Sequence, residues 1–214
     1  MSEQAIVDAV KQIKSTPKQR KFIESIDLAV ALRDVDLKDP SKRFRLEVLL
    51  PHALNKTMNL CIIGDADVIN RAKEAGVKYT LTEDEIDLMI RNPKEVKSYI
   101  KKIDYFLAIP QLMAVVGKSM GRFLGPAGKM PSVLPPNANI EDFVFRYSRI
   151  ARVRVRQNPV VHCRVGTFNM EDEHIAANIR VVINEIENKL EQGSNNIKHY
   201  HIKTTMGSSV KLGV

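Results

Sequence analysis

The sequence predicts two domains of α/β and α+β class. An antiparallel-sheet α+β domain is built from both ends of the chain, and a parallel, three-layer α/β domain is inserted between its halves. Strands that alternate between apolar and other residues lie in both flanks, whereas continuous apolar runs separated by helices fill the middle. Each flank offers only two strands and one helix, which is too little to fold alone. We therefore expect residues 1–57 plus 151–214 to form one domain and residues 58–150 the other.

The N-terminal flank contributes one helix and two strands. Residues 3–14 carry apolar side chains at helical spacing, which predicts an amphipathic helix. Residues 26–32 and 44–50 alternate between apolar and other residues, so each is expected to be a strand with one face toward a core.

The middle of the chain has the pattern of a Rossmann-like parallel unit. The run Leu60-Cys61-Ile62-Ile63 predicts a strand buried on both faces, and the helix after it ends at Gly76. Residues 77–81 and 103–109 predict two further strands, and residues 112–123 another helix. This alternation is typical of a parallel sheet with helices on both faces.

The C-terminal flank returns to half-buried strands. Residues 161–165 alternate, a long helix covers residues 175–190, and a last strand leads to Thr205. The chain is expected to cross between the domains near residues 51–58 and 150–159, and both crossings contain proline. Such a two-stranded connection predicts hinge motion.

Composition places the protein among soluble globular proteins. Of its 214 residues, 44% are apolar and 27% are charged. No apolar run approaches the roughly 20 residues that span a bilayer, and the start lacks the apolar centre of a signal peptide. We therefore expect a cytoplasmic protein without membrane association, in which Cys61 and Cys163 are reduced core thiols.

The net charge of +8 favours an anionic partner, and its distribution points to the flanks. Residues 58–150 carry 13 Lys and Arg against 11 Asp and Glu, whereas the flanks together carry 20 against 14. The basic excess thus belongs to the domain built from both ends. The alternative explanation is a solvated basic surface without a partner.

The last strand and the turn after it are the strongest candidates for a nucleic-acid site. One face of the strand is polar and partly cationic, with His199, His201, Lys203 and Thr205. Thr205-Met206-Gly207 then leads into two serines, where small residues allow close approach to the backbone and hydroxyls offer hydrogen bonds. A cationic strand that ends in such a turn is suited to receive a phosphate backbone.

A second group of candidates surrounds the start of the first strand. Lys18, Arg20 and Lys21 form a basic cluster beside Phe22, whose ring either stacks on a nucleotide or belongs to the core or a sheet edge. If the strands pair as expected, one sheet face gathers Ser25, Asp27, His162, Arg164, Lys203 and Thr205. An acid on a basic face can accept hydrogen bonds from ribose 2′-hydroxyls or base amines.

The glycine-rich segment VVGKSMGRFLGPAGKMP, residues 115–131, does not fit a nucleotide-binding loop. A phosphate loop needs a glycine five residues before its Gly-Lys-Ser/Thr. Leu112 and Phe123 stand at that position in the two possible registers, and Met130 replaces the magnesium-binding hydroxyl in the second.

Glycines and basic residues in this segment suggest other roles. Gly117, Gly121 and Gly125 recur every fourth residue and predict a helix face without side chains, suited to close packing. The turn that follows is expected to display its basic side chains, either as plain surface charges or as a secondary RNA contact; the candidates are Lys118, Arg122 and Lys129.

The sequence gives no reason to expect a catalytic or metal site. His199 and His201 share a strand face, but no cysteine or carboxylate stands at ligand spacing near them. His162 and Cys163 are strand neighbours, so their side chains point to opposite faces. We therefore expect no enzyme, cofactor or metal. Two other function classes stay open: an enzyme that uses the central unit for a nucleotide, and an interaction module whose basic face binds an acidic partner.

Several segments together resemble the ribosomal protein L1 family, nearest its archaeal members. They are KFIESIDLAVALRDVD, LLPHALNKTMNLCIIGD, MAVVGKSMGRFLGPAGKMP, VVHCRVGTF and HIKTTMGSSVKL, and they span nearly the whole chain. The glycine and proline pattern of residues 117–131 and the Thr-Thr-Met-Gly sequence are specific in combination.

The resemblance implies a non-catalytic protein of the large ribosomal subunit. The domain built from both ends would bind a stalk element of large-subunit rRNA through the residues that match the family motifs, namely Lys21, Phe22, Ser25, Asp27, His162, Arg164, Thr205, Met206 and Gly207. It also implies a role in exit-site tRNA movement and translational repression by binding the protein's own operon mRNA. We expect a monomer when the protein is off the ribosome.

Overall fold

The computed structural model describes residues 3–15, 20–54 and 58–212. Its contacts divide the chain into a first unit of residues 1–56 and 149–214 and a second unit of residues 57–148. The expected fold class is confirmed, because the first unit contains an antiparallel sheet and the second a parallel one. The domain boundary expected at residue 57 lies outside the described residues.

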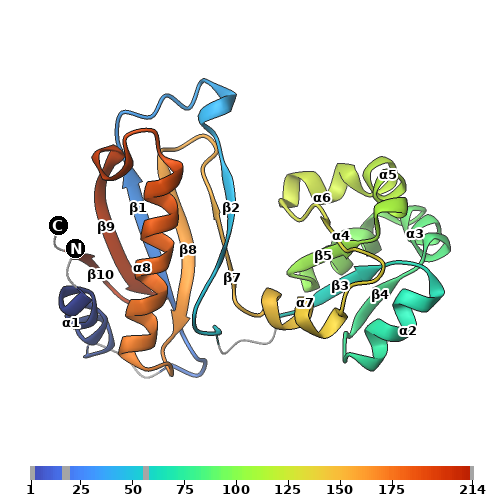
Figure 1. Ribbon diagram of the computed structural model, residues 1–214, viewed down its shortest axis with the longest axis horizontal. Coiled ribbons are helices and arrows are strands. Elements are labelled where there is room, and N and C mark those ends of the chain that lie inside the picture. Colours follow the sequence, from blue (N-terminus) through green and yellow to red (C-terminus); the bar gives the residue numbers. More distant parts are fainter. Residues whose placement is uncertain (1–2, 16–19, 55–57, 213–214) are drawn as a thin grey trace. The chain divides into compact units, whose positions relative to one another are not determined.

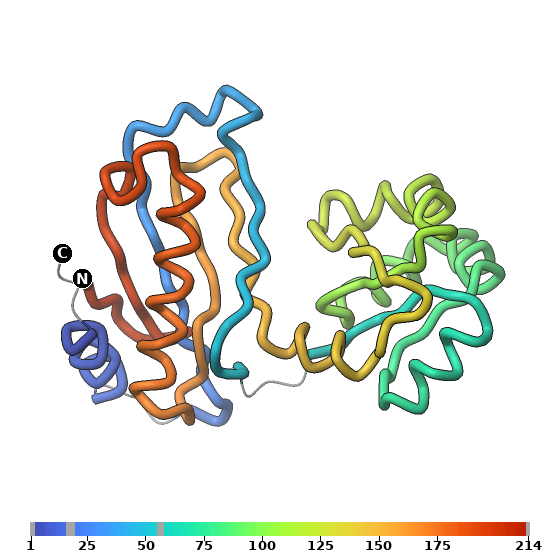
Figure 2. The backbone as a smooth tube through the Cα atoms, viewed as in Figure 1, coloured from blue at the N-terminus to red at the C-terminus, as the bar shows by residue number. Residues whose placement is uncertain are grey.

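The main sheet of the first unit joins the two ends of the chain. Its strands follow the order β10-β9-β1-β8 and are all antiparallel. They are β1 (Ser25–Leu32), β8 (Val160–Thr167), β9 (Ile197–Thr204) and β10 (Ser209–Leu212). Figure 2 shows the blue β1 between the orange β8 and the red β9, so a strand from the N-terminal flank lies between two from the C-terminal flank.

Two helices, α1 (Glu3–Ser15) and α8 (Asp172–Lys189), cover one face of this sheet (Figure 1). The apolar stripe of α8 lies at helical spacing and is buried, with Ile175, Ile179, Val182 and Ile186. The alternate residues of β1 that face it are fully or almost fully buried, and each such side chain contributes about 1.5–3 kcal/mol. No described helix of the first unit lies on the opposite face, which we call the open face.

A two-stranded ribbon lies next to the main sheet. Strand β2 (Arg45–Leu49) pairs antiparallel with β7 (Ile150–Arg154), and a short loop, residues 155–159, links β7 to β8. The domain crossing expected near residues 150–159 lies instead between Ser148 and Arg149, before this strand. Ile150, Ala151 and Val153 are buried, and β2 needs a hydrogen-bonding partner, so this stretch forms a strand. Short 3-10 turns lie at Pro40–Lys42 and Gly193–Asn196.

The second unit is built on a parallel sheet of order β4-β3-β5-β6. Its strands are β3 (Leu60–Ile63), β4 (Tyr79–Leu81), β5 (Tyr105–Ala108) and β6 (Ser132–Val133). Figure 1 shows helices on both faces, α2 and α7 on one and α3 to α6 on the other. The helices are α2 (Ala66–Glu74), α3 (Glu83–Ile90), α4 (Pro93–Lys102), α5 (Pro110–Ser119), α6 (Gly121–Ala127) and α7 (Ile140–Tyr147). Every residue of β3 and β5 is buried, as expected for central strands of three layers.

The glycine-rich segment differs from its expected form. It contains two helices, because α5 ends and α6 begins at Met120, and Gly128 at φ 68° ends α6. The expected close packing along Gly117, Gly121 and Gly125 is wrong. The three glycines do not share one continuous helix, and within the described chain a Cβ added at any of them would meet no atom within 4 Å.

Both cysteines are core residues, as expected. Cys61 in β3 and Cys163 in β8 are buried and not bridged. Burial raises the pKa of each thiol to about 12. Among the described residues, none of the helices combines the length and apolar character that a bilayer crossing needs.

Candidate nucleic-acid interface

The open face carries a row of charges across three strands. Asp27 of β1 pairs with Arg164 of β8 on one side and with Lys203 of β9 on the other. Cross-strand partners point to the same face of a sheet, so one acid lies between two cations. The strand register therefore confirms the prediction that these three residues lie on one face of the sheet.

Asp27 is held in an environment that does not fully compensate its charge. Partial burial raises the pKa of its carboxyl, while the charges of Arg164, Lys203 and His162 act in the opposite direction. Beside it, the buried Nε of Arg164 has no hydrogen-bond partner within the described part of the chain. A half-buried carboxylate on a cationic face can accept hydrogen bonds from a ligand that supplies donors.

A second row on the same face is formed by histidines. His162 of β8 and His201 of β9 pair with the two sides of Ala29. Lys211 of β10 pairs with His201 and extends this row. His199 lies one pair further along β9, with its ring 6.2 Å from that of His201. The face is therefore polar and cationic over its four strands, with a small residue at its centre.

The turn between β9 and β10 is fastened to the start of β1. The backbone N–H of Thr205 donates to the carbonyl oxygen of Ser25 at 3.0 Å, and the N–H of Ser25 donates to the hydroxyl of Thr205 at 3.1 Å. Glu24 accepts a 2.9 Å hydrogen bond from the N–H of Met206. That bond, followed by one from the Thr204 hydroxyl, holds the pKa of the Glu24 carboxyl below its ordinary value.

Gly207 is required by the way this turn folds. A Cβ at this position would lie 2.3 Å from the hydroxyl oxygen of Thr204, which is far inside van der Waals contact. Thr204 is itself buried. Gly207 thus leaves an exposed turn without a side chain, and the close approach of a ligand at this position stays a prediction.

Three exposed apolar side chains surround this fastening. Phe22 is 53% exposed, Ile23 58% and Met206 60%. The alternative that Phe22 belongs to the core is therefore wrong, and its ring is available for stacking. Lys21 is also exposed, Arg20 lies 3.6 Å from the carboxylate of Glu24, and Lys18 lies outside the described residues.

The three candidates for a secondary contact belong to the second unit. Lys118 and Arg122 are exposed, and the guanidinium of Arg122 stacks on Phe123 at 4.7 Å. Lys129 is not displayed as expected. Its ammonium donates to the carbonyl oxygens of Ile100, at 2.8 Å, and of Ile103, at the C-terminal end of α4.

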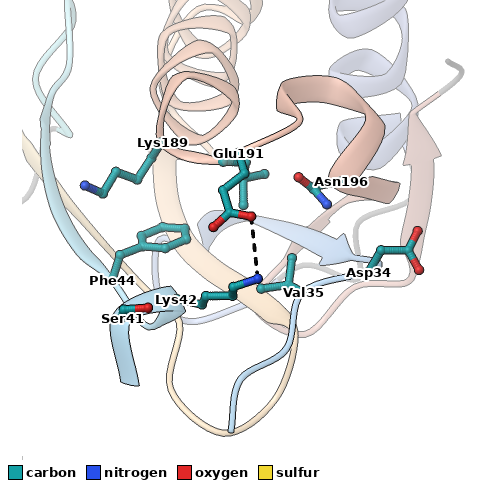
Figure 3. Close-up of a pocket in the computed structure, with 9 residues that line it drawn as sticks. Asp34, Val35, Ser41, Lys42, Phe44, Lys189, Glu191 and Asn196 are labelled. Carbon is teal, nitrogen blue, oxygen red and sulfur yellow. Dashed lines mark ion pairs between the residues drawn. The ribbon is translucent and has the colours of Figure 1, made fainter. Parts of the chain in front are cut away.

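A small hollow of about 130 Å³ lies at the opposite end of the main sheet (Figure 3). Lys42 and Glu191, which face each other across it, form an ion pair of 3.5 Å. Asn196 donates to the carbonyl of Arg33 and accepts from the N–H of Gln192. The lining of the hollow balances two acids, Asp34 and Glu191, with two lysines, so it gives no chemical reason to expect a particular ligand. No three His, Cys, Asp or Glu residues of the described chain come together as a metal site.

Sequence reasoning missed Glu24, although a signal was present. Glu24 stands two residues before Ile26 and therefore on the buried side of β1. An acid at a core position needs hydrogen-bond donors, and here the turn supplies them.

Comparison with known proteins gives a consistent result. A sequence model of the family described as "Ribosomal protein L1p/L10e family" matches residues 10–208. The large ribosomal subunit protein uL1 of Thermococcus kodakarensis is 41% identical over 210 residues, which cover 98% of this chain and 97% of that protein. The uL1 protein of Pyrococcus horikoshii is 42% identical, with 98% and 95% covered. That of Methanococcoides burtonii is 37% identical over 212 residues, with 99% and 100% covered.

Proposed function

Since this chain belongs to the ribosomal protein L1p/L10e family, we propose that it is a component of the large ribosomal subunit that binds a stalk element of large-subunit rRNA. The relatives compared above are named as large-subunit proteins and match this chain over nearly its whole length. In this proposal the protein is not an enzyme and acts at the ribosome by binding alone.

The observation that carries the proposal is the open face with the fastened turn at its end. Lys203 and Arg164 are placed to contact phosphates, which gives affinity that falls with salt. Asp27 between them accepts hydrogen bonds from ribose 2′-hydroxyls, which DNA lacks. The exposed ring of Phe22 offers a surface on which a base stacks, worth about 1–3 kcal/mol.

The turn adds selectivity for the shape of the RNA. Thr205, Met206 and Gly207 present an exposed backbone that is held in place by hydrogen bonds to Glu24 and Ser25. A rigid surface loses less conformational entropy on binding than a mobile one. A site for an acidic protein would not need an acid at the centre of a basic face, whereas RNA offers ribose hydroxyls that donate to it, so RNA fits this surface better than an acidic protein.

Two further roles follow if this surface reads RNA shape. An RNA in the protein's own operon mRNA that folds like the rRNA element would occupy the same face, and translation of that mRNA would then be repressed. On the ribosome, the protein would take part in moving the exit-site tRNA, aided by hinge motion at the two crossings. The same proposal includes a monomeric protein when it is off the ribosome.

Filter binding of the full chain to the stalk fragment of large-subunit rRNA tests the proposal. Thr205→Ala removes the hydroxyl that accepts from Ser25, and we expect affinity to fall about tenfold, the equivalent of ~1.4 kcal/mol. Ser194→Ala, which removes an exposed hydroxyl elsewhere in the same unit, is the matched control. Equal binding by wild type and Thr205→Ala would refute the assigned site. Filter binding to the leader of the protein's own mRNA tests the role in repression. Equilibrium dialysis with ATP, GTP and NAD tests the alternative that the protein is an enzyme that binds a nucleotide.

A further inference from the structure

The end of β7 and the loop that leads to β8 carry arginines that the fold does not neutralise. Glu47 of β2 forms ion pairs with Arg45 at 2.9 Å and with Arg152 at 3.4 Å. Arg154, further along β7, and Arg156, in the loop after it, are exposed and form no ion pair with any described residue. Glu47 thus compensates Arg45 and Arg152, whereas Arg154 and Arg156 are left uncompensated.

The register of the ribbon makes this arrangement costly for the isolated protein. Arg154 is the direct cross-strand partner of Arg45. Like charges in directly opposed positions destabilise a β pair. Consistent with this, the loss of some hydration and then the charges of Arg156, Arg152 and Arg45 lower the pKa of Arg154. A bound anion would relieve the repulsion.

The same end of the ribbon is hollowed. A pocket of about 410 Å³ is lined by Arg154, Arg156, Gln157, Asn158, Val160 and His162. Two guanidinium groups provide planar, bidentate donors that match phosphate oxygens. The side-chain amides of Gln157 and Asn158 add neutral donors, and no carboxylate lines the pocket.

We propose that this pocket is a second anchor of the RNA, in which Arg154 and Arg156 bind a phosphate group; the inference rests on the RNA-binding function proposed above. His162 links the anchor to the open face, because it lines the pocket and also pairs with Ala29 in the histidine row. Strand β8 runs from this pocket to Thr167, which pairs with Ser25 beside the fastened turn. Those seven residue steps span roughly 23 Å, so one RNA strand would be held at both ends of the face.

Filter binding of the full chain to the stalk rRNA fragment over a range of KCl concentrations tests the anchor. Arg154→Ala/Arg156→Ala is compared with Arg180→Ala/Lys11→Ala, which removes two exposed charges from the helices on the opposite face. We expect the first pair to lower affinity at least tenfold. The slope of log affinity against log salt should also fall, by about 0.7–0.9 for each phosphate that the protein no longer neutralises. The control pair should change neither quantity.

Phosphate ethylation interference locates the contact. At the phosphates that Arg154 and Arg156 contact, ethylation should block binding of the wild type and of Thr205→Ala. At the same phosphates, ethylation should not block binding of the Arg154→Ala/Arg156→Ala protein. Millimolar inorganic phosphate should not displace the RNA, since a free ion lacks the contacts of the open face. Thermal unfolding of the double variant is expected at the wild-type temperature or above, because the repulsion with Arg45 is removed.

The outcomes separate this inference from the proposed function. If the wild type binds the rRNA and the double variant matches it in affinity and salt slope, the anchor is refuted while RNA binding stands. A lower affinity with an unchanged slope and unchanged interference would also refute it, because the same phosphates would still be bound. If the wild type binds no rRNA, both proposals fail.

Discussion

The carboxylate of Glu24 accepts a 2.9 Å hydrogen bond from the backbone N–H of Met206, a residue 182 positions away in the chain. This contact fastens the start of β1 to the turn between β9 and β10. Thr204, from the end of β9, adds its hydroxyl to the same carboxylate. One buried acid thus orders the turn that we assign to RNA.

Replacement of Glu24 by Gln should loosen the turn. A carboxylate accepts stronger hydrogen bonds than an amide oxygen, so Glu24→Gln should speed hydrogen exchange of the Met206 amide and weaken rRNA binding. Glu185→Gln, at an exposed site on α8, is the control. An unchanged exchange rate for Met206 would contradict the role given to Glu24.

The same contact predicts an acid transition in the wild type. Because the pKa of Glu24 is lower in the folded state than its ordinary value of 4.5, its stabilising effect is complete above that value. It is lost as pH falls through the lowered pKa. Protection of the Met206 amide, followed by NMR, should therefore decrease in that acid range in the wild type and stay flat in Glu24→Gln.

A methyl group at Gly207 should disturb the turn. In Gly207→Ala the new Cβ would lie 2.3 Å from the Thr204 hydroxyl, which must then rotate away from Glu24. We expect a loss of about 1–2 kcal/mol in the free energy of unfolding, together with weaker rRNA binding. Gly117→Ala, in helix α5 with open space around it, should instead gain about 0.5–1 kcal/mol. Urea denaturation compares the two, and equal effects would be evidence against the crowded turn.

We expect Asp27 to lower the stability of the folded protein and to provide selectivity for RNA over DNA. Its pKa is raised in the folded state, so the folded protein binds the proton more tightly, and stability falls as pH rises from the ordinary value of 3.8 through the raised one. Asp27→Asn should therefore be more stable than wild type at pH 7, and the difference should vanish below about pH 3.8.

In binding, Asp27→Asn should reduce the preference for the rRNA fragment over DNA of the same sequence, because the acceptor for ribose hydroxyls is lost. Asp8→Asn, on the exposed side of α1, serves as the control for one removed charge. A variant with lower stability at pH 7, or with full discrimination against DNA, would show that Asp27 acts in some other way.

Asn178 should be a large stability determinant of the first unit. It is fully buried in α8, accepts from the N–H of His52 at 3.0 Å and donates to the carbonyls of His52 and Val165. Asn178→Ala leaves these backbone groups without partners, and we expect a loss of about 2–4 kcal/mol by urea denaturation. Asn184→Ala, exposed on the same helix, should change stability by less than ~0.5 kcal/mol. Similar values for both would contradict the buried network.

The sequence predicts the strands whose two faces differ clearly. Strand β1 alternates between buried and half-buried residues over all eight positions, and the buried stripe of α8 follows the helical period. Sequence reasoning misses strand β7 because its alternation precedes Pro159 and is interpreted as a crossing. It misses strand β10 because four residues give little periodic signal.

The sequence predicts on which face of a strand a site residue lies, but it does not predict every contact between residues that are far apart in the chain. The row of Asp27, Arg164 and Lys203 follows from strand parity, which the sequence shows. The repulsion between Arg45 and Arg154 depends on a register between strands more than 100 residues apart, which no local pattern encodes. Lys129 was misplaced for a similar reason, since only the folded chain brings it to the end of α4.

The central position of β1 between β8 and β9 has a consequence for synthesis. A ribosome that makes this chain delivers β1 early, yet both of its neighbours arrive only near the end, after the whole second unit. The second unit, which is formed by one continuous segment of the chain, can fold while β1 still has no paired strand. Nascent or truncated chains therefore cannot engage RNA through the open face, and only finished copies compete for it.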